Sequence, residues 1–407
     1  MSRTRNLLAD AVALRTRSDV PIGTMLSGGL DSTSITALID EHRRGLTPAG
    51  SQPAFDGLRL FHQTFSAVWP NTPHDEERPI SLLCDQLGVH SHRIRITGEA
   101  ATSVLDKVVY HLDEPFVTPV PIVQYLLMRE ARRAGVRVVL NGHGSDETLA
   151  GYSGKFAPAH LADLLATSRL GSFAAEYSAL RRAGRWKRSD IVVELLRRAG
   201  PRAVRLAAEH ALRRWRLTNE GLFTQPDRDQ DVSSFDDSID WGGTSLSRLQ
   251  AQLWTHVVAK PLPLVLRFED RMSMASSVEA RVPFMDYRMI EFAMSLPDEL
   301  KVRDGYTKWI LRAAMANVLP APIAWNPRKK QFAARFEDWI RGPWREMLSD
   351  LFLTGTSHVE PYLQMCEFRR RLQGYLGGDD RTMRPNEIWR ILSMELRFRT
   401  FLRHKGA

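Results

Sequence analysis

Strand-like and helix-like segments alternate through the first 150 residues, and this alternation constrains the fold more than any other feature of the chain. Apolar runs that predict strands lie over 21–26, 60–68, 89–96 and 137–140. Amphipathic runs that predict helices lie over 6–17, 32–44, 76–87, 101–112 and 121–134. Strands separated by helices pair in parallel and are covered on both faces. The pattern therefore predicts an α/β fold with a doubly wound parallel sheet.

Beyond about residue 155 the pattern changes, because helical periodicity dominates to the end of the chain. We expect no strand there, and we expect a polar loop over 219–247. The pattern divides the chain into a sheet-containing core over 1–154, a basic helical insertion with the polar loop over 155–250, and a helical C-terminal part over 251–407 that completes the domain.

Composition excludes several classes of protein. Of the 407 residues 43 % are apolar, which is enough for a full core, but no run approaches the roughly 18 apolar residues of a membrane span. Cys84 and Cys366 form neither a close pair nor a metal-binding spacing, so a disulfide framework and a structural zinc site are not expected. We expect a protein of a reducing, cytoplasmic compartment that has no membrane partner.

The excess positive charge is local. Residues 181–216 hold twelve Lys or Arg and three acidic residues, which accounts for the whole net charge of +9. The basic residues stand among Leu, Val and Ala at helical spacing, and this favours solvated helix faces over a nucleic-acid surface. Nucleic acid is therefore not an expected partner, although a tRNA-modifying enzyme stays open as an alternative.

A glycine loop between the first strand and the next helix carries the strongest chemical signal. It runs Leu26-Ser27-Gly28-Gly29-Leu30-Asp31-Ser32. Two glycines allow close approach of a ligand, and the N–H groups at the start of the helix favour anions such as phosphate. The carboxylate of Asp31 fits beside a phosphate when a divalent cation lies between them, and Mg²⁺ prefers this combination.

A second glycine loop follows the strand over 137–140. It runs Asn141-Gly142-His143-Gly144-Ser145-Asp146-Glu147. Ligands of doubly wound sheets bind beyond the carboxyl ends of the strands, so both loops are expected at one rim. Asp31 and Asp146 can then share one Mg²⁺.

The arrangement Ser-Gly-Gly-x-Asp-Ser over 27–32 resembles the pyrophosphate loop of ATP pyrophosphatases. The second loop continued to Gly151-Tyr152, the segment 112–115 and the segment 271–286 each resemble parts of asparagine synthetases, in the order of that family. The chain thus resembles the synthetase half of glutamine-dependent asparagine synthetases. This resemblance implies a sheet of the adenine nucleotide alpha hydrolase type.

The resemblance also implies an activity, in which ATP converts aspartate to β-aspartyl-AMP with release of pyrophosphate, and ammonia then gives asparagine. It implies Mg²⁺ on Asp31 and Asp146 and a catalytic lysine at Lys308. The nucleotide contacts that it implies are Leu26, Ser27, Gly28, Gly29, Asp31, Ser32, Ala67, Asn141 and Gly142. The expected partners are ATP, aspartate or another carboxylate, and ammonia or another amine.

The surroundings of Lys308 add a modest signal. Thr307 has the pattern of a helix N-cap, which would place Lys308 in the first helical turn. A cation there opposes the helix dipole by about 0.3–1 kcal/mol, and a phosphate would offset that cost.

Two features depart from the family. Its glutaminase nucleophile is an N-terminal cysteine, whereas Ser2 follows Met1 here and no room for that domain precedes the glycine loop. We expect a fragment of a longer protein, a separate glutaminase chain, or the use of free ammonia or another amine.

The second departure is His143, which stands where many members carry an acid that deprotonates the ammonium. An imidazole with its ordinary pKa near 6.5 suits the same role. The change keeps open a ligase or cyclase of the β-lactam or lasso-peptide type.

Overall fold

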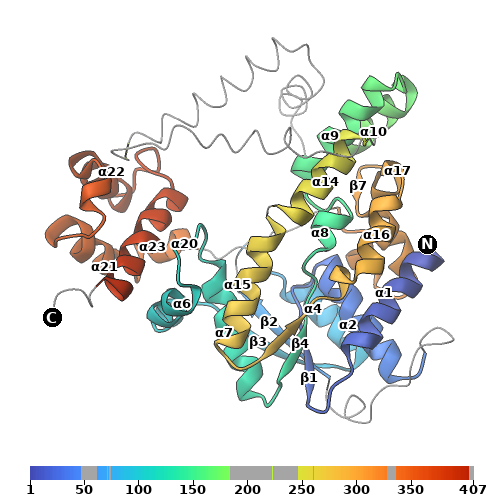
Figure 1. Ribbon diagram of the computed structural model, residues 1–407, viewed down its shortest axis with the longest axis horizontal. Coiled ribbons are helices and arrows are strands. Elements are labelled where there is room, and N and C mark those ends of the chain that lie inside the picture. The colour runs from blue at the N-terminus through green and yellow to red at the C-terminus, as the bar shows by residue number, and fades with distance from the viewer. Residues whose placement is uncertain are drawn as a thin grey trace.

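The computed structural model describes residues 1–46, 62–70, 72, 75–183, 222, 246–259, 261–327 and 336–402. At its centre lies a five-stranded parallel sheet with the order β3-β2-β1-β4-β5 (Figure 1). The strands are β1 (Ile22–Met25), β2 (Gln63–Val68), β3 (His90–Arg95), β4 (Val138–Leu140) and β5 (Glu279–Arg281). The α/β class and the first four strands predicted from the sequence are confirmed.

Helices cover both faces of this sheet. Alternate residues of a strand point to opposite faces, and β4 shows this, because Val138 and Leu140 join one apolar cluster while Val139 joins another. The first cluster contains α1 (Ser2–Arg15), α2 (Leu30–Arg43) and α4 (Glu77–Leu87), whereas the second contains α7 (Val120–Arg133). The sheet is therefore doubly wound. The single helix predicted over 101–112 is wrong, since α5 (Gly98–Thr102) and α6 (Leu105–Leu112) divide it.

The expectation that no strand lies beyond residue 155 is also wrong. Strand β5 pairs in parallel with β4, with Val138 opposite Glu279 and Leu140 opposite Arg281. It is a short, polar strand at the edge of the sheet, so its sequence carries no apolar run. Its extended form depends on pairing with β4, which is a tertiary contact that periodicity cannot reveal.

A second correction concerns the strands β6 (Val302–Arg303) and β7 (Tyr306–Thr307), which form an antiparallel hairpin. Val302 is buried in a cluster made mainly by the helices α9 (Ser153–Ala166), α10 (Leu170–Arg182) and α14 (Arg248–Val258). We call these three helices the helical layer. The hairpin therefore packs on the helical layer and not on the parallel sheet.

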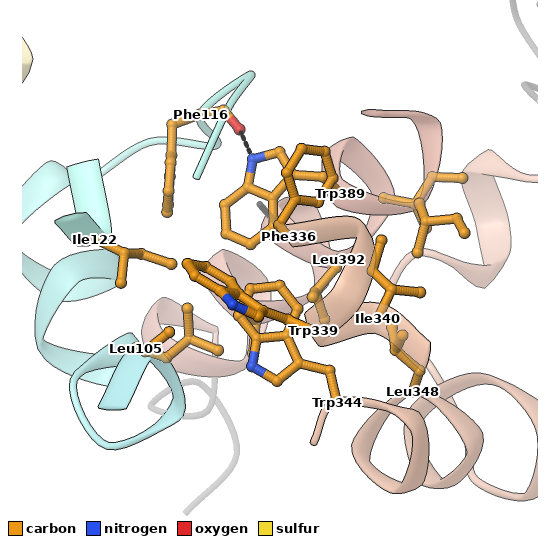
Figure 2. Packing of buried hydrophobic residues seen from close by; sticks show 14 of the residues in the cluster. Leu105, Phe116, Ile122, Phe336, Trp339, Ile340, Trp344, Leu348, Trp389 and Leu392 are labelled. Atoms are coloured by element: carbon orange, nitrogen blue, oxygen red, sulfur yellow. Dashed lines mark hydrogen bonds between the residues drawn. The ribbon is translucent and has the colours of Figure 1, made fainter. Parts of the chain in front are cut away.

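The C-terminal helices form a further apolar cluster against α5, α6 and α7. Trp339 and Trp344 pack edge to face, and Trp344 stacks on Trp389 at 5.6 Å (Figure 2). The indole Nε1 of Trp389 donates to the carbonyl of Phe116 at 2.8 Å, which ties the C-terminal helices to the segment before α7. The larger helices of this part are α20 (Phe336–Arg341), α21 (Arg345–Ser349), α22 (Met365–Leu376) and α23 (Pro385–Phe401).

Helix α15 (Leu262–Met274) runs between these parts and leads into β5 (Figure 1). It is followed by η2 (Pro283–Met285), α16 (Tyr287–Ser295), α17 (Asp298–Lys301), α18 (Trp309–Met315) and α19 (Ala321–Ala324). Among the described residues, no helix combines the length and the apolar character that crossing a membrane requires.

The segment over 279–286, which carries part of the family resemblance, fastens α1 to the sheet. Arg281 Nη1 donates to the carbonyls of Arg15 and Arg17 at 2.9 and 2.8 Å. Asp286 accepts from Arg15 Nη1 at 3.0 Å and from Arg288 Nε at 2.9 Å. These contacts give this segment a structural role at the end of α1.

Candidate functional site

The loop after β1 is fixed by backbone geometry. The amide of Leu26 donates to the carbonyl of Phe65 at 2.9 Å, so the strand extends to the edge of the glycine pair. Gly28 has a φ of +72°, which favours glycine. Helix α2 begins at Leu30, so Asp31 lies in its first turn. The first N–H groups of a helix have no partner within the helix, so the start of α2 offers donors to an anion.

Hydroxyl groups complete this loop. The Ser27 and Ser32 hydroxyl oxygens lie 3.1 Å apart, and the amide of Ser27 donates to Ser32 Oγ at 3.2 Å. Ala67 lies buried in the neighbouring strand β2. All of the nucleotide contacts expected from the first loop therefore lie at one end of β1 and β2.

The loop after β4 packs directly on the first loop. A side chain at Gly142 would place its Cβ 2.8 Å from Asp31 Cβ, so glycine is required for this approach. Ser145 Oγ donates to Asp31 Oδ1 at 2.8 Å. Asp146 follows in the first turn of α8 (Ser145–Thr148). Two segments more than 100 residues apart in the sequence thus form one rim.

Lys308 lies between the two loops. Its Nζ is 2.6 Å from Asp31 Oδ2 and 2.6 Å from Asp146 Oδ1, and its side chain is only 3 % exposed. Burial acts to lower the pKa of Lys308, but the charges of Asp146 and Asp31 outweigh it and raise that pKa. Lys308 is therefore a protonated, buried cation that holds two carboxylates together.

The predicted local structure around Lys308 is wrong. Thr307 is the last residue of β7, and α18 begins only at Trp309. Lys308 stands between them with a φ of +55°, a conformation that costs a residue with a side chain roughly 1–2 kcal/mol. Residues held in such strained conformations concentrate at functional sites, because the surroundings must impose them.

A buried carboxylate that the sequence analysis missed organises the second loop. Glu269 on α15 accepts from Asn141 Nδ2 at 2.6 Å, from Gln124 Nε2 at 2.6 Å and from His143 Nε2 at 3.2 Å. Its side chain is 5 % exposed. The sequence did carry a signal for a buried Glu269, which is its position in an amphipathic helix. Glu269 stands seven residues after Leu262 and three before Met272, and at this helical spacing it shares the buried face with them.

The contact with Glu269 sets the state of His143. Burial acts to lower the pKa of His143, but the hydrogen bond to Glu269 and the charges of Glu269, Glu147 and Asp146 raise it above its ordinary value. Because Nε2–H donates to Glu269, the neutral imidazole carries its lone pair on Nδ1. The side chain is one-third exposed and can exchange protons with a ligand.

Glu147 is a further buried acid beside this rim. It accepts a hydrogen bond from Tyr152 Oη at 2.6 Å. Burial raises the pKa of Glu147, and the hydrogen bond from Tyr152 only partly opposes this. Both residues stand in the loop that the sequence analysis singled out, but their pairing depends on the turn at Gly151, where a Cβ would lie 1.7 Å from Asp146 Oδ1.

The two carboxylates of the rim supply oxygen ligands of the kind that Mg²⁺ prefers. Asp31 and Asp146 each reach one point, the position of the Lys308 ammonium, from separate loops. Two carboxylates supplemented by phosphate oxygens and water form a common Mg²⁺ environment. No group of three or more His, Cys, Asp or Glu suited to a metal ion occurs in the part of the chain that the structure describes.

The fold and the rim define an α/β protein of the adenine nucleotide alpha hydrolase type, with helices covering both faces of a parallel sheet. The family model for asparagine synthase matches residues 3–403. The chain therefore belongs to the asparagine synthase family.

Individual relatives are distant. Asparagine synthetase [glutamine-hydrolyzing] 1 of Bacillus subtilis is 25 % identical over 402 residues, which cover 96 % of this chain and 58 % of the relative. A putative asparagine synthetase of Mycobacterium tuberculosis is 27 % identical over 98 % of this chain and 57 % of its own length. Amidase chyE of Penicillium rubens is 26 % identical over 85 % of this chain and 54 % of its own length. The chain thus spans a little more than half the length of these relatives.

Proposed function

We propose that this chain is the synthetase part of an ATP- and Mg²⁺-dependent amide-forming ligase that converts aspartate to asparagine through β-aspartyl-AMP. The observation that carries the proposal is the convergence of Asp31, Asp146 and Lys308 beside the glycine loop of residues 27–32. In this proposal the adenylating core is the segment over 1–154, and the later segments complete it.

In the first step an oxygen of the substrate carboxylate attacks the α-phosphorus of ATP, and the bond to the β-phosphate breaks to release pyrophosphate. Backbone N–H groups at Gly28, Gly29 and the start of α2, together with the Ser27 and Ser32 hydroxyls, would bind the departing pyrophosphate. Leu26, Ala67, Asn141 and Gly142 would border the nucleoside.

Lys308 would stabilise the charge that builds on the phosphates. Asp31 and Asp146 would hold Mg²⁺, which neutralises phosphate charge when bound.

In the second step the nitrogen attacks the acyl carbon, and the bond to AMP breaks. The incoming ammonium must lose a proton, and His143 would accept it on Nδ1. Glu269 supports this assignment because it fixes Nε2–H and stabilises the imidazolium that forms, as a carboxylate does for many catalytic histidines.

Whether the nitrogen comes from glutamine or from free ammonia is a property of the whole protein. The relatives that carry "glutamine-hydrolyzing" in their names are longer than this chain. We propose ammonia as the nitrogen substrate of the 407-residue chain, delivered free or by a glutaminase. The basic stretch over 181–216 lies almost wholly outside the described residues, so the alternative of a tRNA-modifying enzyme is not part of the proposal.

The test uses the purified 407-residue chain with ATP, MgCl₂, aspartate and ammonium chloride, with glutamine replacing ammonium in a second arm. The expected products are AMP, pyrophosphate and asparagine, from ammonium and not from glutamine. Asp31→Asn and Asp146→Asn should each abolish pyrophosphate release while the far-ultraviolet circular dichroism stays unchanged. Release of ADP and phosphate would contradict the mechanism.

A second candidate is a ligase or cyclase that joins another carboxylate and amine. The similarity to amidase chyE and the presence of His143 favour it. Pyrophosphate release that needs a carboxylate other than aspartate, or that is not followed by turnover on ammonium, would replace the first proposal with this one.

A further inference from the structure

The carboxylate of Glu176 receives two hydrogen bonds from the turn that precedes Lys308. The amide of Asp304 donates to Glu176 Oε2 at 2.8 Å, and the amide of Gly305 donates to Glu176 Oε1 at 2.9 Å. Glu176 is buried on α10, in the segment that the sequence analysis treated as an insertion. A carboxylate that accepts both N–H groups of a two-residue turn fixes its position and orientation.

The turn itself is tightly specified. Asp304 and Gly305 have φ values of +53° and +77°, as a type I′ hairpin turn requires, and Asp-Gly is a preferred pair for it. A Cβ at Gly305 would lie 2.7 Å from the carbonyl oxygen of Ala179, so the turn also packs directly on α10. The hairpin is thus held to α10 by packing and by charge-assisted hydrogen bonds.

The other end of the hairpin leads directly to Lys308, and hydrogen bonds hold it in place. Arg312 Nε donates to the carbonyl of Thr307 at 2.8 Å, and Arg312 Nη1 donates to the carbonyl of Ala324 at 2.7 Å. Lys308 follows at once in its left-handed conformation. Only the two residues of β7 separate the turn from Lys308, so a displacement of the turn would reach the Lys308 backbone.

We propose that Glu176 is a positioning residue for the adenylation step, because it fixes the hairpin that holds Lys308 between Asp31 and Asp146. Glu176 does not touch the rim itself. Its effect is transmitted through the hairpin to Lys308, and this inference rests on the function proposed above. A small misplacement of a group that stabilises a transition state lowers kcat strongly, with little effect on ground-state binding.

The test compares Glu176→Ala with Asp163→Ala. Asp163 is a matched control, since it is a carboxylate of the same helical layer that accepts a backbone N–H, from Leu249 at 3.0 Å, but the hydrogen bonds to its carboxylate come from α14 and not from the hairpin. Glu176→Ala should lower the kcat of aspartate-dependent pyrophosphate release about 10- to 100-fold with an unchanged KM for ATP. Asp163→Ala should lower the melting temperature while leaving kcat near the wild-type value.

Two further measurements separate positioning from general destabilisation. Hydrogen exchange of the peptide over 302–309 should accelerate in Glu176→Ala and not in Asp163→Ala, whatever the activity. In a Lys308→Met background, Glu176→Ala should produce no further loss of kcat, because both changes act through the same group. Should Glu176→Ala fold poorly, Glu176→Gln, which keeps one acceptor oxygen, serves in the same comparison with an intermediate loss.

Unchanged kcat in the Glu176 variants, or an equal loss in the Asp163 variant, would overturn the inference and leave the proposed function standing. A wild-type chain that releases no pyrophosphate with any carboxylate would overturn the proposed function, and the inference with it.

Discussion

The two carboxylates and the lysine of the rim are supported by different regions of the molecule. Asp31 and Asp146 stand in loops that directly follow β1 and β4, so the hydrogen bonds of the parallel sheet fix their separation. Lys308 stands after a hairpin that packs on the helical layer and is held by Glu176. The difference teaches that the charge balance of the rim depends on how the helical layer sits relative to the sheet.

The largest effect is expected when the cation of Lys308, which follows the hairpin, is removed. Lys308→Met should lower the rate of adenylation about 10²- to 10³-fold, because the preorganised charge opposite the phosphates is lost. Pyrophosphate release in a single turnover measures this rate.

Lys308→Arg sharpens the same test. The guanidinium is larger, and the Lys308 Cε already lies 2.2 Å from where a Cβ at Gly151 would stand, so Arg should not restore the rate. Lys107→Met, which removes an exposed lysine of α6, should behave as the wild type does. Near-normal adenylation in Lys308→Met would show that the loops after β1 and β4 are sufficient for adenylation without the Lys308 cation.

An intermediate effect is expected from the helix that joins the two regions. Glu269→Gln removes the charge that raises the pKa of His143, so that pKa should fall. The acidic limb of the pH profile for amide formation should therefore shift to lower pH, and the rate should drop on the order of 10-fold because His143 becomes a weaker base. Asparagine formation with ammonium, measured across pH, tests this.

The chain offers a matched control for that experiment. Glu395 is buried in the C-terminal helices and accepts from His358 Nδ1 at 3.2 Å, the same distance as in the pair of His143 and Glu269. Glu395→Gln should lower the free energy of unfolding and leave the pH profile in place. A profile that moves equally in both variants would refute the role given to Glu269.

The smallest effect, on stability alone, is expected at the ion pairs of Asp286 that fasten α1. Hydrogen bonds from Arg288 and Arg15 hold the pKa of Asp286 at about 2, below its ordinary value near 3.8, although burial opposes them. A depressed pKa gives stability that is present above about pH 4 and is lost as the pH falls towards 2. Asp286→Asn should therefore lower the free energy of unfolding at pH 7 by about 2 kcal/mol.

Urea unfolding at pH 7 and at pH 3 measures this, and the difference between wild type and variant should shrink at the lower pH. Asparagine is a good N-cap, so the start of α16 is preserved in the variant. Pyrophosphate release should not change. A loss of stability that is the same at both values of pH would assign the effect to packing and not to charge.

The amount of the fold that could be predicted differs between these regions for a physical reason. The buried strands β1, β2 and β4 are predicted by their apolar runs, and glycine loops mark the ends of β1 and β4, because burial and a tight turn act on neighbouring residues. Strand β5 and the strands of the β6–β7 hairpin have only two or three residues each, and they are strands only because of what they pair with. Their sequences could not reveal them.

The sequence by itself determined the parallel α/β core and the two loops that carry Asp31, Asp146 and His143, because a glycine turn after a strand is a local property of the chain. Only the tertiary structure decided that Lys308 lies between the two aspartates, that Glu269 fixes His143, and that Glu176 fixes the hairpin. Each of these contacts joins residues more than 100 positions apart. Local periodicity reports only the side of an element that is buried, and the partner that buries it is chosen by the folding of the whole chain.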